Sequence, residues 1–176
     1  MYLTARVPLS IEALAEILDR QAIDLRESLR RLVAVVHVPD QHDQPGLRTL
    51  HASFGDYLLE RATDRLRVVA SQGDEALARG CLHIMRKRLY FNVSRSHSSF
   101  KRNSRDMVHV ISLSVQYACT QWIYHVASLP RPAILNSEIV STFRPRFLFW
   151  LEVMSVLDQV QRATAILITA TATVCR

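Results

Sequence analysis

His51 lies in the stretch LHASFGDYLL at positions 50–59, and its imidazole could take part in several kinds of chemistry. It could serve as a metal ligand, a general base, a hydrogen-bonded core side chain or a sensor of a nearby anion. The neutral ring donates one hydrogen bond, whereas the imidazolium donates two and carries a positive charge. The residues around His51 must distinguish among these four roles.

Metal binding and catalysis gain little support from the sequence. No second His, Cys or Asp stands at ligand spacing from His51, and His37 and His42, expected in a strand and a turn, do not make a helical ligand pair. The four glycines are isolated, so the phosphate loop G-x-x-x-x-G-K-[ST] is missing. Neither G-x-S-x-G nor H-E-x-x-H occurs. We therefore expect no enzyme, no catalytic residue and no metal site in this chain.

The basic stretch RKRLYFNVSRSHSSFKRNSR at 86–105 is a second candidate for chemistry, with seven bases, no acid and three aromatic residues. Bases interleaved with rings can bind single-stranded nucleic acid or an anionic membrane surface. The anion contacts would then come from Arg86, Lys87, Arg88, Lys101 and Arg102. We favour the alternative of a solvated helix end and a loop, in which the first three bases complement the C-terminus of a helix.

Charge is spread unevenly along the 176 residues, which have a net charge of +6. Residues 1–75 carry 12 acids and 9 bases, a net of −3, whereas residues 76–176 carry 4 acids and 13 bases, a net of +9. This asymmetry suggests two regions with different surfaces. Three cysteines without metal-like spacing favour a reducing, intracellular compartment. No signal peptide and no membrane-spanning apolar run is apparent.

Two helices and a hairpin are expected in the first part of the chain. Apolar residues at helical spacing predict helices over 11–18 and 25–32. The β-branched segment at 33–39 ends at a proline and predicts a strand. Residues 47–51 alternate and can pair back with it across the polar turn at 39–46.

A third helix is expected to begin at Ser53, because Ser53 and Asp56 form a capping-box pattern. Two helices, a small hairpin and a capped helix make a winged-helix-like domain at about 1–65. His51 would lie between the second strand and the N-terminus of that third helix.

The rest of the chain reads as helices separated by breaks. The apolar pattern predicts a helix from Asp74 to about Leu89, a loop over 92–105 and a helix over 113–127. The segment LPRP at 129–132 ends that helix.

Two further helices are expected around 139–143 and over 147–157, whereas the Thr- and Val-rich tail at 165–176 fits a strand or an exposed end better than a helix. The sequence assigns no role to residues 162–176. The predicted fold is therefore mainly α, with an antiparallel helical domain at 66–176 after the winged helix.

The chain resembles the segment that follows the NACHT module in fungal signal-transduction ATPases of the STAND class, relatives of the NOD-like receptors that often end in WD or other repeats. Six stretches occur in the family's order and at roughly its spacing, and they cover most of residues 7–157. They are PLSIEALAEIL at 8–18, VVHVP at 35–39, LHASFGDYLLE at 50–60, LARGCLHIM at 77–85, QYACTQWIYHV at 116–126 and FLFWLEVMSVL at 147–157.

The resemblance implies a winged helix and a helical domain that regulate a nucleotide switch. In the family, the winged helix folds back over bound nucleotide in the inactive state, and a histidine at the position of His51 reaches the phosphates of ADP. The stretch is also similar to the Met-His-Asp motif of plant receptors, with Leu50 and His51 in the first two places and Ala52 replacing the aspartate. The role of His51 as a nucleotide sensor and its role as a core residue both remain open.

The resemblance further implies that ADP or ATP belongs to the parent protein and that this chain holds no cofactor of its own. Its partners would be the NACHT module and the repeat domain of the same cytoplasmic protein, with oligomerisation possible in that parent, no membrane and no nucleic acid. The predicted function is a non-catalytic regulatory fragment. The alternative is a winged-helix nucleic-acid-binding protein, in which Arg26, Arg30 and Arg31 would face the phosphate backbone.

Overall fold

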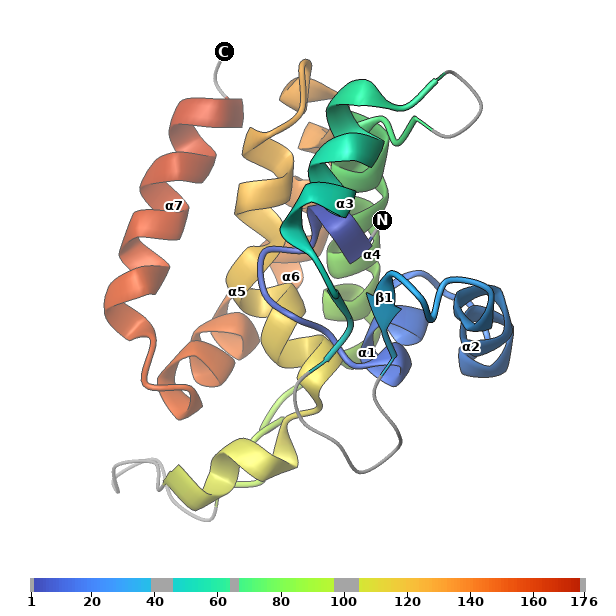
Figure 1. Cartoon of the computed structure of the whole chain (residues 1–176). Helices are drawn as coiled ribbons and strands as arrows, with labels where there is room; N and C mark the ends of the chain where they lie inside the picture. The colour runs from blue at the N-terminus through green and yellow to red at the C-terminus, as the bar shows by residue number, and fades with distance from the viewer. Residues whose placement is uncertain (1, 39–45, 64–66, 97–104, 175–176) are drawn as a thin grey trace. The chain divides into compact units, whose positions relative to one another are not determined.

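The computed structural model describes residues 2–38, 46–63, 67–96 and 105–174. These residues are mainly helical, with seven α-helices and one two-stranded antiparallel sheet (Figure 1). The predicted mainly α class with a small hairpin is confirmed at this level. None of the described helices is both long and apolar enough to cross a bilayer.

Contacts divide the chain into two compact units, Met1–Leu77 and Ala78–Arg176. The predicted boundary between a domain at 1–65 and one at 66–176 falls within 64–66, outside the described residues, and stays a prediction.

The first unit contains short helices and the hairpin. Its elements are η1 (Tyr2–Thr4), α1 (Ile11–Ile17), α2 (Ala22–Arg30), β1 (Val36–His37), β2 (Arg48–Thr49), α3 (Ala52–Asp56) and the π-helical turn η2 (Tyr57–Arg61).

The core of this unit is built mainly by α1, which packs on α2. The Ser10 hydroxyl accepts a hydrogen bond from the backbone N–H of Ala13 at 3.1 Å, so α1 begins with a side-chain cap. On α2 only Leu29 is buried, and Leu32 falls outside the helix with 39% of its surface exposed. The predicted apolar stripe over 25–32 is therefore wrong in its last turn.

The hairpin pairs β1 with β2 as predicted, with Val36 opposite Thr49. The segment that leads into β2 is fixed by the backbone N–H of Leu47, which donates to the carbonyl of Leu9 at 2.8 Å. A Cβ on Gly46 would lie 2.4 Å from that carbonyl oxygen, so the close approach requires glycine. These contacts fix the strand that ends just before His51.

Helix α4 (Ala70–Arg88) begins in the first unit and ends in the second. It starts four residues before the predicted Asp74, because the carbonyl of Val69 accepts the backbone N–H groups of Gln72 and Gly73 and closes an earlier turn. The other elements of the second unit are η3 (Arg105–Val110), α5 (Leu113–Ala127), η4 (Pro132–Leu135), α6 (Asn136–Val156) and α7 (Val160–Val174).

Helices α5, α6 and α7 pack against one another (Figure 1). Trp122 of α5 and Trp150 of α6 are both fully buried. The ring of Phe143 lies 4.8 Å from that of Trp122 and 5.4 Å from that of Trp150, measured between centroids. The indole N–H of Trp150 donates to the carbonyl of Cys119 at 3.0 Å. Both tryptophans belong to the core, and α5 has the bounds that the apolar pattern predicted.

Helix α6 runs through Pro145, where the sequence predicted two separate helices. Proline removes one hydrogen bond from the helix and crowds the preceding turn. Phe143 and Phe147, on either side of it, both contact the ring of Trp150, at 5.4 and 5.9 Å between centroids. Both halves are also held on α5, because Phe143 packs on Trp122 before the proline and Trp150 bonds a carbonyl of that helix after it. These contacts offset the cost of the proline.

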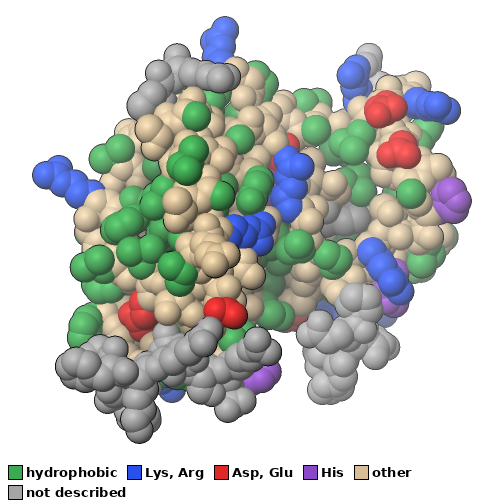
Figure 2. All heavy atoms as spheres, turned by 90° about the vertical axis from the view of Figure 1, so that its left-hand side faces the viewer, with side chains coloured by type: hydrophobic (Ala, Val, Ile, Leu, Met, Phe, Trp, Pro, Cys, Tyr) green, Lys and Arg blue, Asp and Glu red, His purple; other side chains and the backbone are tan. Residues whose placement is uncertain are grey.

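The tail at 165–176 was expected to be a strand or an exposed end, but its described residues, which end at Val174, are helical and belong to α7. The hydroxyls of Thr169, Thr171 and Thr173 each donate to the carbonyl four residues earlier, at 2.9, 2.9 and 2.7 Å. Ala163 and Ile166 bury the inner face. Figure 2 looks onto the side that carries α7, where hydrophobic side chains gather. Tertiary packing thus overrides the β-preference of threonine and valine.

Candidate functional site

His51 links β2 to α3 and caps the helix with its own ring. Its backbone is extended, with φ −135° and ψ 133°, and its Nδ1 accepts the backbone N–H of Ser53 at 3.2 Å. The Ser53 hydroxyl lies 2.6 Å from the same nitrogen. The predicted cap at Ser53 is therefore wrong: α3 begins at Ala52, and His51 is its N-cap.

These contacts fix which ring nitrogen of His51 carries the proton. A backbone N–H can only donate, so Nδ1 must be unprotonated and accept. In the neutral ring the proton then lies on Nε2, and the Ser53 hydroxyl donates to Nδ1 as well. A proton on Nδ1 would break the bond from the Ser53 backbone N–H, whereas the Ser53 hydroxyl could turn and accept it. With the backbone cap formed, Nε2–H is the hydrogen-bond donor that the ring presents outward.

The side chain of His51 is exposed, as is that of Leu50 before it, which keeps 58% of its surface in solvent. The interpretation of His51 as a core residue is therefore wrong. An exposed imidazole with Nδ1 engaged can present Nε2–H to an acceptor such as a phosphate oxygen. Among the described residues, no group of three His, Cys, Asp or Glu side chains is placed to hold a metal ion.

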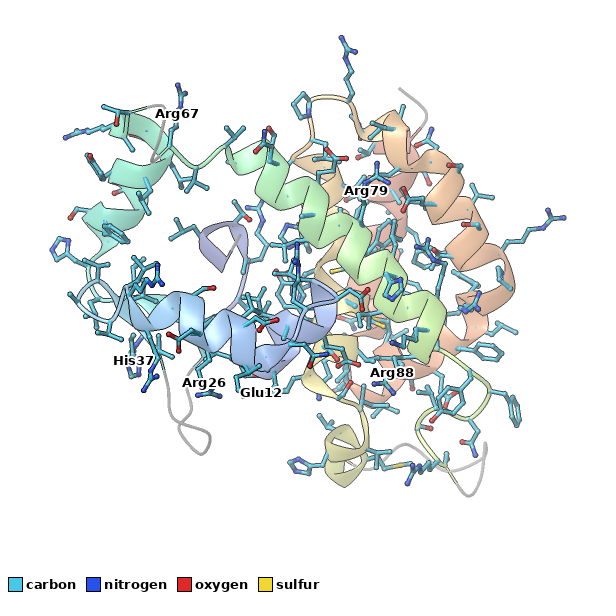
Figure 3. All side chains as sticks on the ribbon, turned by 90° about the vertical axis from the view of Figure 1, so that its right-hand side faces the viewer. Glu12, Arg26, His37, Arg67, Arg79 and Arg88 are labelled. Atoms are coloured by element: carbon cyan, nitrogen blue, oxygen red, sulfur yellow. The ribbon has the colours of Figure 1, made fainter. Side chains whose placement is uncertain are left out.

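Of the five predicted anion contacts, Arg86, Lys87 and Arg88 form the last turn of α4, and Lys101 and Arg102 lie outside the described residues. Lys87 and Arg88 are exposed. The structure therefore keeps two of the three described bases at the molecular surface, where Figure 3 shows Arg88 at the end of its helix.

Arg86 has a different environment, because it joins α4 to α6. Its guanidinium donates to the Thr142 hydroxyl at 3.3 Å and lies 3.9 Å from the Glu138 carboxylate. Arg79 lies two turns earlier on the same face of α4 and hydrogen-bonds the same carboxylate. Glu138 thus receives two arginines from α4, which favours a structural role for Arg86 over contact with an external anion.

The arginines that would read DNA in the alternative function are partly neutralised. Arg26 forms an ion pair with Glu12 at 2.8 Å, and Figure 3 shows these two side chains meeting between α2 and α1. Arg30 pairs with Glu27 at 3.4 Å along the same helix. Such pairs reduce the positive field that a recognition helix needs.

Sequence reasoning missed a groove of about 730 Å³ in the second unit. Its walls are the end of α5, the segment Leu129–Ala133 and the face of α7 around Ile168, and Arg131 is the charged residue in its lining. The groove could not be foreseen, because α7 was not expected to be a helix. The sequence did contain one sign of the groove, the LPRP segment, which follows the end of α5 and supplies one wall.

Comparison with models of protein families, with curated proteins and with solved structures finds no match to this chain. What the fold itself defines is a mainly helical protein with a small antiparallel hairpin and an exposed, helix-capping histidine.

Proposed function

We propose that this chain is a non-catalytic regulatory segment of a fungal NACHT-type signal-transduction ATPase, which contributes autoinhibition and nucleotide-state sensing through His51. The observation that carries the proposal is the geometry of that residue: it is exposed, its Nδ1 is occupied by Ser53, and its Nε2–H is the donor left for an external acceptor. The resemblance of the surrounding stretch supplies the identity of that acceptor.

In the parent protein, an upstream NACHT module supplies the phosphate loop that this chain lacks, and ADP or ATP binds there. With ADP bound, the winged helix packs over the nucleotide, and Nε2–H of His51 donates to the terminal phosphate. Because this contact is made in the closed state alone, it shifts the equilibrium toward that state. The repeat domain of the parent is the other intramolecular partner.

The winged-helix identity of the first unit and the cytoplasmic location belong to the same proposal. The first unit contains two helices, then a two-stranded hairpin and then a third helix, in the expected order along the chain. The described cysteines, Cys81 and Cys119, are free thiols, as a reducing compartment allows.

The test is His51→Asp in this segment, grafted into a full-length relative. Aspartate is a strong N-cap, so α3 should keep its start, but its charge repels a phosphate. A hydrogen bond to a charged group contributes about 1.5–3 kcal/mol, so the ADP off-rate should rise about tenfold to a hundredfold with an unchanged melting temperature.

Ser53→Ala is the matched control, because it removes the hydroxyl beside Nδ1 and leaves Nε2–H in place. It should change the ADP off-rate less than about threefold. An ADP off-rate that stays at the wild-type value in His51→Asp would refute the proposed sensing role.

A further inference from the structure

The groove of about 730 Å³ in the second unit takes no part in the proposed nucleotide switch. Its volume falls within the roughly 300–1,000 Å³ of pockets that hold small molecules. One wall is the end of α7, and the other is the chain from the end of α5 to η4, which contacts α7 (Figure 1). Three alanines, two prolines, a leucine and an isoleucine belong to the lining, so the groove can hold an apolar body.

The α7 wall offers a ligand mainly apolar surface. The hydroxyls of Thr169 and Thr173 donate to carbonyls of their own helix, at 2.9 and 2.7 Å, so neither proton is free to bind a ligand. Ile168 keeps 65% of its surface exposed. An alkyl chain that covers Ile168 would remove this apolar surface from water, which favours binding.

The opposite wall is stiff, because Pro130 and Pro132 stand on either side of Arg131. Each proline fixes its own φ, and Pro132 also excludes the helical conformation at Arg131, which has φ −136° and ψ 77°. The backbone N–H of Ile134 donates to the carbonyl of Arg131 at 3.3 Å, and Leu129 is buried. The segment therefore holds its arginine beside the groove with little backbone freedom to lose when a ligand binds.

Arg131 gives the lining a positive charge. It is exposed, and among the described residues no carboxylate forms an ion pair with it. A guanidinium binds a carboxylate through two parallel N–H donors. The net charge of +9 over residues 76–176 adds to the attraction for an anion.

We propose that this groove binds an amphipathic carboxylate, a molecule with an aliphatic chain and one carboxylate end. The chain lies along the apolar walls and covers Ile168, and the carboxylate accepts the paired N–H donors of Arg131. Apolar walls favour the chain over a small polar anion, and the arginine favours the acid over an uncharged molecule of the same length. This proposal does not rest on the proposed nucleotide switch.

The test is calorimetric titration of the full chain with octanoate at constant ionic strength, with 1-octanol and acetate as parallel arms. Octanoate should bind saturably at one site per chain, 1-octanol about tenfold more weakly, and acetate without saturation. Arg131→Gln removes the charge, so it should weaken the octanoate Kd about tenfold but change the 1-octanol Kd less than about twofold. Ile168→Gln removes apolar surface, so it should weaken the Kd of both ligands.

Arg144→Gln is the matched control, because Arg144 is an exposed base of the same unit that does not line the groove. It should change the octanoate Kd less than about twofold. Equal weakening by Arg144→Gln and Arg131→Gln would mean diffuse attraction to the basic surface, and would overturn the proposal. So would the absence of saturable octanoate binding, equal affinity for octanoate and 1-octanol, or an unchanged Kd in Ile168→Gln. Circular dichroism checks that all three variants stay folded.

Discussion

At the scale of single residues, His51 performs a task that sequence rules assign to other side chains. The capping-box pattern identified Ser53 because N-cap rules favour Ser, Thr, Asp and Asn. An imidazole nitrogen also accepts a backbone N–H, and here it belongs to the residue two positions before the predicted helix start. The sequence drew attention to His51 but could not give its capping role or its tautomer, because both depend on the turn geometry.

The two described cysteines should be chemically inert in the folded chain. Burial raises the pKa of the Cys81 and Cys119 thiols well above the ordinary value, and for Cys119 the neighbouring Cys81 raises it further. The thiolate is the reactive form, so at pH 8 almost none is present. In a Cys175→Ser variant, a disulfide reagent should label no thiol of the native protein within minutes.

The same variant should yield two labelled thiols once guanidinium unfolds it, because both pKa values then return to the ordinary range. Raising the pH from 7 to 9 should leave the native protein unlabelled but should speed labelling of the unfolded chain. Rapid labelling of the native protein at pH 8 would show that the α4–α5 core around these cysteines opens readily.

At the scale of elements, the sequence predicted what local pattern decides and missed what distant contacts decide. Helix α5 has an unbroken apolar pattern, and its bounds match the prediction. Pro145 and the threonines of α7 signal breaks locally, yet both segments are helical. Contacts of Phe143 with Trp122 and of Trp150 with the Cys119 carbonyl hold α6 on α5, and burial of Ile166 holds α7. The α6 contacts join residues more than 20 positions apart and cannot be read from the local sequence.

The turn after α4 should depend strongly on one serine. Ser94→Ala removes both a buried hydroxyl and its bond to Glu152, and leaves a carboxylate oxygen with one donor fewer. Removing one partner of a buried hydrogen bond costs about 1–3 kcal/mol. Chemical denaturation should show a fall of that size in the free energy of unfolding.

Ser141→Ala provides the comparison, because Ser141 is exposed on the same helix as Glu152 and its hydroxyl bonds only the carbonyl of Glu138. It should change the free energy of unfolding by less than about 0.5 kcal/mol. If Ser94→Ala proved equally mild, the turn would not be anchored through Glu152.

At the scale of the whole molecule, the structure shows that bases of the acidic and the basic part of the chain have different surroundings. In the acidic part, two of the three candidate DNA-reading arginines are paired with carboxylates. In the basic part, Arg86 is committed to α6, whereas Lys87, Arg88 and Arg95 remain exposed. The sequence predicted where positive charge accumulates, but not which bases a carboxylate on another helix would engage.

This distribution decides how the chain should behave toward nucleic acid. Exposed bases of the second unit lie near two exposed rings, Tyr90 at 52% and Phe91 at 82%, so weak binding of single strands should come from there. Fluorescence anisotropy across a salt series should show a Kd that weakens steeply with salt and does not depend on base sequence. Phe91→Ala should weaken binding, whereas Arg31→Ala, on the acidic unit, should not. Tight, sequence-dependent binding that Arg31→Ala abolishes would instead make the first unit a DNA reader. In that case the ion pairs of Arg26 and Arg30 would have to open on binding, and the regulatory interpretation would give way to the alternative.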